Sequence, residues 1–255
     1  MKPLFRWLLL MSICGPAISA EYPARVQWAE RLTLSTPSTG VVTQVAVQPG
    51  QRVAEGDLLL ALDPRPGAAA LKRAKAVLEE ARQNNEEAKR ELERTQELFD
   101  RTLLSIHDLQ VAQIEAVGAA ARLGQAEAEL VEARLQQEYS RLRSPYDAWV
   151  VALPAQTGQT VVNRCQAQAL AVLAPAGRMA AQAWLDPQQI AALAIGDPVR
   201  VKVDEETFAG KVSLLGLEPD RDPGQVLRYR LEVQFDLPDE RLMRPGQSAL
   251  ILTTD

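Results

Sequence analysis

The chain has 255 residues, of which 47% are hydrophobic and 24% are charged, with 33 acidic and 28 basic side chains. This is the composition of a globular protein, and it excludes a disordered or a collagen-like chain. The formal net charge of −5 does not favour nucleic acid or an anionic membrane surface as the partner.

Residues 1–20 have the features of a secretory signal peptide. Lys2 and Arg6 supply a positive start, the apolar run 4–13 follows, and small residues lead to a plausible cleavage site after Ala20. The apolar run is too short to cross a bilayer, which needs about 20 such residues. We therefore expect export with a cleaved signal, and an uncleaved anchor is the alternative.

Two separate segments, 38–64 and 140–175, share one order of elements. In the first, β-branched residues lead to a turn at Pro49-Gly50, and a further strand and turn precede the apolar strand 58–62. In the second, Thr157-Gly158 stands where Pro49-Gly50 stands, and an apolar strand again follows. We interpret the segments as the two halves of one β-domain that the intervening residues interrupt.

The intervening residues 65–139 carry two apolar repeats with alternating spacings of three and four. Each repeat continues for four heptads, as a coiled-coil seam requires, and the turn at about 101–107 is short enough to join antiparallel neighbours. We predict an antiparallel coiled-coil hairpin with arms roughly 50 Å long, either a solvated stalk or an arm that docks a partner. The seam positions are Leu71, Ala74, Leu78, Ala81, Asn85, Ala88, Leu92, Thr95 and Phe99, and then Leu109, Ala112, Ala116, Ala119, Leu123, Ala126, Leu130, Ala133 and Gln137.

The last segment, 176–255, alternates between strand patterns and glycine turns. A short helix is predicted at Asp186-Pro187, because Asp is a good N-cap and Pro fits the first turn. The segments 207–220 and 226–237 read as long alternating strands, and Arg244-Pro-Gly precedes a final strand.

The two β-halves resemble the halves of a lipoyl or biotinyl carrier domain. Such carriers present a modified lysine on the hairpin between the halves, but here residues 63–66 and the whole helical insertion occupy that place. There is no lysine between Arg31 and Leu71, and none between Ser140 and Val201. A carrier module is therefore an alternative, but the two halves lack the lysine that such a carrier would modify.

A split lipoyl-like domain with an inserted helical hairpin, followed by these strands, resembles the periplasmic adaptor subunits, or membrane fusion proteins (HlyD/AcrA-like family), of bacterial tripartite efflux systems. The resemblance covers residues 38–253 and implies an elongated, multidomain α+β fold, in which 176–255 form a small β-barrel with one short helix. Many adaptors carry a further membrane-proximal domain. Because the chain ends two residues after the last strand, we expect residues 21–37, with two short strands, to be the vestige of that domain.

The turn of the hairpin carries the residues that the resemblance assigns to docking on a TolC-like outer-membrane channel, namely Arg94, Leu98 and Ser105. Arg94 and Leu98 are one helical turn apart and so share a face. Ser105 is well placed to N-cap the second helix, with Asp108 three residues later. Outside this context, a serine at a helix start is usually only a cap.

The resemblance implies a non-enzymatic protein of the periplasm that bridges an inner-membrane transporter, of the resistance-nodulation-division (RND) or the ABC type, and the channel. It also implies self-association, as a hexamer, and membrane association through the transporter. The chain has one histidine, His107, and one cysteine after the signal, Cys165, so we expect no catalytic site, no metal, no cofactor and no internal disulfide. Trp184 is expected in a core. A structural periplasmic coiled-coil protein without a transport partner is the other alternative.

Overall fold

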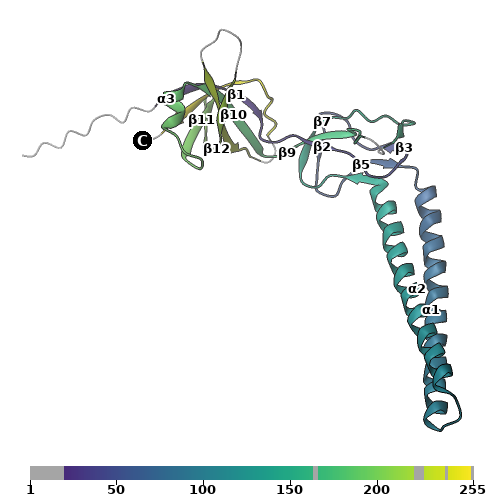
Figure 1. The fold of residues 1–255 in the computed structure, drawn as a ribbon. Helices are drawn as coiled ribbons and strands as arrows, with labels where there is room; N and C mark the ends of the chain where they lie inside the picture. The colour runs from purple at the N-terminus through teal and green to yellow at the C-terminus, as the bar shows by residue number, and fades with distance from the viewer. Residues whose placement is uncertain (1–19, 163–165, 221–226, 239–240, 254–255) are drawn as a thin grey trace, which may run out of the picture. The chain divides into compact units, whose positions relative to one another are not determined.

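The computed structural model describes residues 20–162, 166–220, 227–238 and 241–253 (Figure 1). The predicted signal peptide, except for Ala20, and Cys165 lie outside these residues. The chain forms two compact units, which we name the barrel unit (Met1–Glu30 with Pro175–Asp255) and the helix-bearing unit (Arg31–Ala174).

The barrel unit contains a closed six-stranded barrel in the order β1-β10-β13-β12-β11-β14. Neighbouring strands are antiparallel, and closure of the barrel pairs each of these described strands on both sides. Side chains of alternate residues, such as Leu231, Val233 and Phe235, form the core. The elements are β1 (Glu21–Trp28), β10 (Arg178–Leu185), α3 (Pro187–Ala191), β11 (Pro198–Val203), β12 (Glu206–Asp220), β13 (Arg228–Asp236) and β14 (Ser248–Thr253).

The N-terminal segment 21–37 is used differently from what we expected. Tyr22, Ala24 and Val26 alternate into the barrel core, and β1 closes the barrel between β10 and β14. The next strand, β2 (Leu32–Leu34), pairs with a strand of the helix-bearing unit. Segment 21–37 is therefore divided between the two units: β1 belongs to the barrel, and β2 belongs to the helix-bearing unit. It does not form a separate domain remnant.

The β-strands of the helix-bearing unit form two four-stranded sheets, which together we call the two-sheet domain. Each sheet takes strands from both sides of the helical insertion, so the two halves predicted from the sequence interleave. One sheet has the order β2-β9-β7-β4, with β9 (Ala171–Pro175), β7 (Ala148–Ala152) and β4 (Arg52–Val53), and the other has the order β6-β5-β3-β8, with β6 (Arg141–Arg143), β5 (Leu58–Leu62), β3 (Gly40–Val45) and β8 (Thr160–Val161).

Strand β5 is buried on both faces, as its continuous apolar sequence LLLAL suggests. Leu59 packs with Val53, Val150 and Leu173, whereas Leu60 packs in a second cluster. Leu59 is fully buried, and its neighbours come from both halves. The interior of the domain therefore forms only when both halves are present.

Two equivalent glycine turns form hydrogen bonds between the two halves of the two-sheet domain. Gly50 has φ +86° and its N–H donates to the carbonyl oxygen of Val150 at 2.8 Å. Gly158 has φ +87° and its N–H donates to the carbonyl oxygen of Val42, also at 2.8 Å. Both backbones lie in the left-handed region that glycine adopts without strain. The predicted equivalence of Pro49-Gly50 and Thr157-Gly158 is thus confirmed.

The insertion consists of two long helices, α1 (Arg65–Asp100) and α2 (Ile106–Tyr139), which lie side by side (Figure 1). Their buried residues are mostly small and fall on the predicted seam positions, for example Ala81 on α1 and Ala126 on α2. Small side chains allow the two backbones to approach closely. None of the helices in the described part of the chain is long and apolar enough to cross a membrane.

Hydrogen bonds attach the base of this helix pair to the two-sheet domain. The hydroxyl of Thr36 donates to the carbonyl oxygen of Tyr139 at 2.6 Å, and that of Ser38 donates to the carbonyl oxygen of Gln136 at 3.3 Å. The N–H of Leu62 donates to the carbonyl oxygen of Ser140 at 2.8 Å. The end of α2 is therefore held where the chain re-enters the two-sheet domain.

Asn85 is a buried polar residue in the middle of the α1 seam. Its side-chain Oδ1 has no hydrogen-bond partner among the described residues, although Asn85 is only 4% exposed. A buried carbonyl without a partner costs about 1–3 kcal/mol. We therefore predict that Asn85→Leu, a change of similar volume, raises the free energy of unfolding by about 1 kcal/mol, measured by urea denaturation. A loss of stability would show that the amide makes a compensating interaction.

Candidate functional site

The candidate site is the end of the helix pair, residues 94–108, which we call the tip. Helix α1 ends there with two backbone hydrogen bonds: the N–H of Thr102 donates to the carbonyl oxygen of Phe99 at 2.8 Å, and the N–H of Leu103 donates to that of Leu98 at 3.0 Å. This pair of bonds is the Schellman arrangement, in which the residue after the cap is left-handed. Thr102 takes that conformation with φ +60°.

A β-branched residue is a poor choice for the left-handed conformation of Thr102, because its side chain crowds the backbone. We predict that Thr102→Gly increases the stability of the helix pair by about 1 kcal/mol. The measurement is thermal unfolding followed by far-ultraviolet circular dichroism. An unchanged or lower melting temperature would show that the threonine side chain contributes contacts that offset the strain.

Helix α2 begins with a complete capping box formed by Ser105 and Asp108. The hydroxyl of Ser105 accepts the N–H of Asp108 at 3.2 Å, and the carboxylate of Asp108 accepts the N–H of Ser105 at 3.0 Å. The Ser105 hydroxyl also donates to that carboxylate at 2.6 Å. These side-chain and backbone hydrogen bonds lower the pKa of Asp108 below its ordinary value. The stability that the ionised Asp108 contributes to the cap is therefore fully present above the ordinary pKa of an aspartate, and it is lost as the pH falls through the lowered value. The bond from the Asp108 N–H to the Ser105 hydroxyl does not depend on this ionisation.

The other two predicted docking residues lie on the last turns of α1. The side chain of Arg94 is exposed, and its guanidinium donates to the carboxylate of Glu91 at 2.8 Å, which raises the pKa of Arg94. Leu98 is half-buried one turn further on, and its carbonyl oxygen accepts the N–H of Leu103. Arg94 and Leu98 thus share a face of α1, whereas Ser105 lies across the turn and makes its side-chain hydrogen bonds with Asp108.

Two further residues of the tip were missed by the sequence reasoning. Leu103 is 67% exposed and Ile106 is 56% exposed, so both present apolar surface at the turn. The signal was present in the sequence, because the pair Leu103-Leu104 and then Ile106 are apolar residues in a short turn. An exposed apolar turn is suited to contact with a protein surface.

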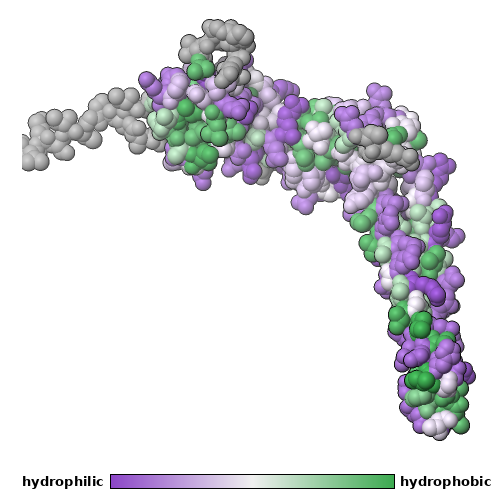
Figure 2. Space-filling view, viewed as in Figure 1, coloured by the Kyte–Doolittle hydropathy of each residue, from purple (hydrophilic) through white to green (hydrophobic). Residues whose placement is uncertain are grey.

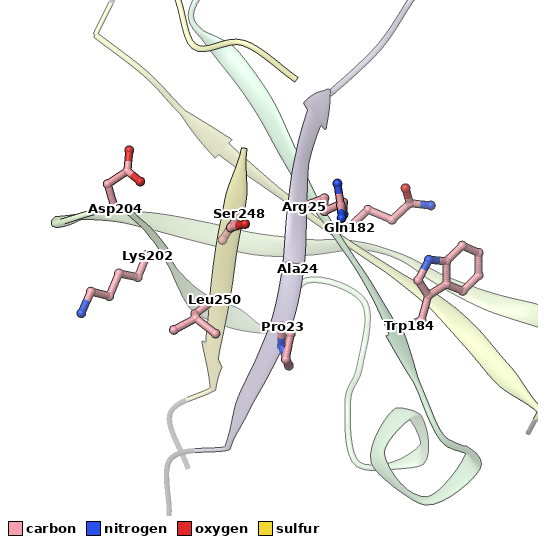
Figure 3. Close-up of a pocket in the computed structure, with 10 residues that line it drawn as sticks. Pro23, Ala24, Arg25, Gln182, Trp184, Lys202, Asp204, Ser248 and Leu250 are labelled. Carbon is pink, nitrogen blue, oxygen red and sulfur yellow. The ribbon is translucent and has the colours of Figure 1, made fainter. Parts of the chain in front are cut away.

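The barrel unit carries a surface hollow of about 670 Å³ along β1 and β14 (Figure 3). Trp184 and Gln182 of β10 lie on one side, and Lys202 with Asp204 lies on the other. Trp184 is 39% exposed, so the expectation that it fills a core is wrong. Its neighbours Ala183 and Leu185 point inward, and the alternation of the strand therefore turns Trp184 outward.

The described residues contain no group of three histidine, cysteine, aspartate or glutamate side chains that could hold a metal ion. His107 is exposed at the start of α2. The tip presents the exposed side chains of Leu103, Ile106 and Arg94.

Comparison with known protein families matches residues 32–172 to the CzcB-like barrel-sandwich hybrid domain. Among curated proteins, YdhJ of Escherichia coli (strain K12) is 24% identical over 190 residues, which cover 74% of this chain and 65% of YdhJ. The multidrug resistance protein MdtA of Cronobacter turicensis is 27% identical over 226 residues, which cover 86% of this chain and 54% of MdtA. The chain thus spans only about half to two thirds of the length of these relatives.

Solved structures with the same fold include a membrane fusion protein and a chimeric protein. Spr0693 of Streptococcus pneumoniae R6 superposes with a TM-score of 0.71 at 16% identity, covering 93% of this chain and 100% of the other. A MacA–MexA chimera that contains the α-hairpin domain of Pseudomonas aeruginosa MexA superposes with a TM-score of 0.68 at 19% identity, covering 94% and 83%. The chain therefore belongs to the family of the CzcB-like barrel-sandwich hybrid domain, and it has the fold of the membrane fusion proteins.

Proposed function

We propose that this protein is the periplasmic adaptor of an efflux system, which bridges an inner-membrane transporter to a TolC-like outer-membrane channel. In this proposal α1 and α2 form a coiled-coil hairpin that acts as a docking arm, and the tip meets the channel. The observation that carries the proposal is the exposed apolar surface of the tip, beside the well-defined ends of its two helices. The name of the relative MdtA, a multidrug resistance protein, supports the same interpretation.

The docking surface is proposed to consist of an apolar centre with a charged neighbour. Leu98, Leu103 and Ile106 supply the apolar contacts, and Arg94 supplies a guanidinium for carboxylates or carbonyl oxygens of the channel. The Schellman ending fixes the backbone where α1 ends, and the capping box fixes it where α2 begins. A tip that is already rigid loses less conformational entropy when it docks.

Further parts of the proposal follow the family. The protein assembles as a ring, as a hexamer, and it contacts an inner-membrane transporter of the RND or the ABC type. It is exported to the periplasm by a cleaved signal peptide and performs no chemistry of its own. The proposed division is 38–64 with 140–175 as the lipoyl-like domain, 65–139 as the hairpin and 176–255, joined by β1, as the barrel.

Co-purification tests the proposal as a whole. The full chain, tagged at its C-terminus, is crosslinked in the cell envelope and purified, and its partners are identified by mass spectrometry. We expect an outer-membrane channel and a multi-spanning transporter together. Recovery of the folded chain without either protein would contradict the proposal and favour a solitary coiled-coil protein.

Ser105 allows capping to be separated from docking. Ser105→Ala removes the N-cap and is expected to destabilise the helix pair by about 1 kcal/mol, whereas Ser105→Asn retains an N-cap residue. If the hydroxyl itself meets the channel, Ser105→Asn melts like the wild type but transports poorly. Normal efflux by Ser105→Asn would show that Ser105 serves only as a cap.

A further inference from the structure

Helix α2 has a second apolar stripe on the face turned away from α1. Its positions follow the seam positions by five residues, which is about 140° around the helix. Ile114 and Val117 are each 71% exposed, and Val131 is 54% exposed. The outer stripe consists of Ile114, Val117, Ala121, Gly124, Ala128, Val131 and Leu135.

The outer stripe is unusual for a surface helix. Its spacing of three and four is sustained without a charged residue, whereas the corresponding outer positions of α1 include Glu79, Glu86, Arg90 and Glu93. Apolar patches interrupt the hydrophilic surface of the helix pair in Figure 2. A helix that is apolar on two faces is generally buried on both. The inner face packs against α1, and the outer face is exposed.

The sizes of the side chains in the outer stripe are symmetric about Gly124. Small residues occupy the centre and large ones both ends, so two antiparallel copies fit with Gly124 facing Gly124. Val117 then lies opposite Val131 of the second copy, and Ile114 lies within one residue of the position opposite Leu135. We propose that the outer stripe is the interface of an antiparallel homodimer of this protein. Such a two-fold contact uses one self-complementary patch on both copies.

The charged residues beside the outer stripe favour the antiparallel orientation. A parallel pair would place Glu127 of one copy beside Glu132 of the other, and like charges in such flanking positions repel. The antiparallel pair separates these carboxylates by about three helical turns.

The length of the outer stripe is sufficient for specific association. Residues 114–135 span roughly 33 Å of helix. Two helices in contact over that length bury on the order of 1,000 Å² in total, which reaches the lower limit for a specific interface. The outer positions of α1 carry charges instead, so a second α2 is the occupant that matches the stripe.

The dimer has a consequence at the base of the helix pair. The outer stripe ends near Tyr139, beside a hollow of about 550 Å³ that Pro37, Ser38 and Leu135 also line. In the antiparallel pair, Ile106 of the second copy lies within one helical turn of Tyr139, so each base covers the other tip. A dimer of this kind cannot dock its tips, and it is a resting form of the free adaptor. This last consequence rests on the proposed function, whereas the dimer itself does not.

Sedimentation velocity of the purified full chain tests the interface. We expect a dimer at micromolar concentration, and we expect Val117→Glu and Val131→Lys each to raise the dissociation constant at least about tenfold, because an unpaired charge is buried. An equimolar mixture of the two variants recovers the dimer, because the introduced carboxylate at position 117 then faces the introduced ammonium group at position 131. Glu80→Gln, a change on exposed α1 surface, leaves the association unchanged and serves as the control.

Cysteine crosslinking tests the orientation in a chain whose Cys14 and Cys165 are replaced by serine. We expect Ile114→Cys and Leu135→Cys to crosslink when mixed and not to crosslink alone. Self-crosslinking of Ile114→Cys would overturn the antiparallel dimer. A chain that stays monomeric, or a dimer that Val117→Glu does not weaken, would overturn the interface. Capture of an outer-membrane protein by the outer stripe would assign the stripe to that protein instead.

Discussion

Leu98→Asp is expected to abolish efflux while the protein stays folded and abundant. Leu98 is half-buried on the last turn of α1, and the exposed Leu103 and Ile106 follow it at the turn. Docking would bury the new carboxylate against apolar surface without a partner, and truncation or charging of a central contact commonly costs about 2 kcal/mol or more. A loss of this size weakens binding to the channel by about thirtyfold or more. The readout is the drug tolerance of cells that depend on this adaptor.

The stability of the Leu98 variant must be checked together with its activity. The backbone carbonyl of Leu98 still accepts the N–H of Leu103, so the Schellman ending of α1 is retained. We therefore expect the melting curve to match that of the wild type. Glu97→Asp, which adds no charge on the neighbouring exposed position, is the matched control and leaves efflux intact. Normal efflux by a well-folded Leu98→Asp protein would contradict the assignment of the tip.

Leu59→Ala is expected to give the largest loss of stability, about 3 kcal/mol. Leu59 is fully buried in a cluster that includes Val53 from before the helices and Val150 and Leu173 from after them. Removal of its side chain leaves a cavity where the two halves of the two-sheet domain meet. The helix pair separates the two halves in the sequence, so the halves are joined in space by this core. The cavity therefore weakens the contact that brings the two halves together. Urea denaturation followed by the fluorescence of Trp149 on β7 measures the change.

The control for Leu59 is Val41→Ala on β3. Val41 is 41% exposed, so its truncation removes little buried surface and is expected to change the free energy of unfolding by less than about 0.5 kcal/mol. Equal effects of the two substitutions would show that the two-sheet domain does not depend on the contact between its halves.

Much of the fold could be predicted because its sequence signals are local. The turns at Gly50 and Gly158 stand out in the sequence, and both adopt the positive φ that glycine allows. The start of α3 was predicted from Asp186-Pro187, and the carboxylate of Asp186 indeed accepts the N–H groups of Gln188 and Gln189. The buried seam of α1 and α2 follows the heptad spacing, because burial on a helix repeats with its turn.

Features that depend on distant partners could not be predicted. Strand β1 joins the barrel through β10 and β14, which are far away in the sequence, so its own alternation did not reveal its neighbours. Trp184 faces outward because the register of β10 with β1 and β13 sets the phase of the strand. Thr102 adopts a conformation typical of glycine, and no local rule assigns it there.

The candidate site was predicted only in part. Arg94, Leu98 and Ser105 all lie at the tip, and the capping role of Ser105 is confirmed by its hydrogen bonds with Asp108. Leu103 and Ile106 were missed, because an apolar residue in a turn is equally consistent with burial, and only the structure shows that these two are exposed.

Site-specific photocrosslinking in cells is the most direct test of the adaptor role. A photoreactive residue replaces Leu98 at the tip in the full chain, and a matched variant carries it at Glu79, an exposed position on α1 far from the tip. We expect position 98 to capture a TolC-like outer-membrane channel and position 79 not to capture it. Absence of any channel adduct at position 98, with the protein folded and abundant in the envelope, would contradict the account.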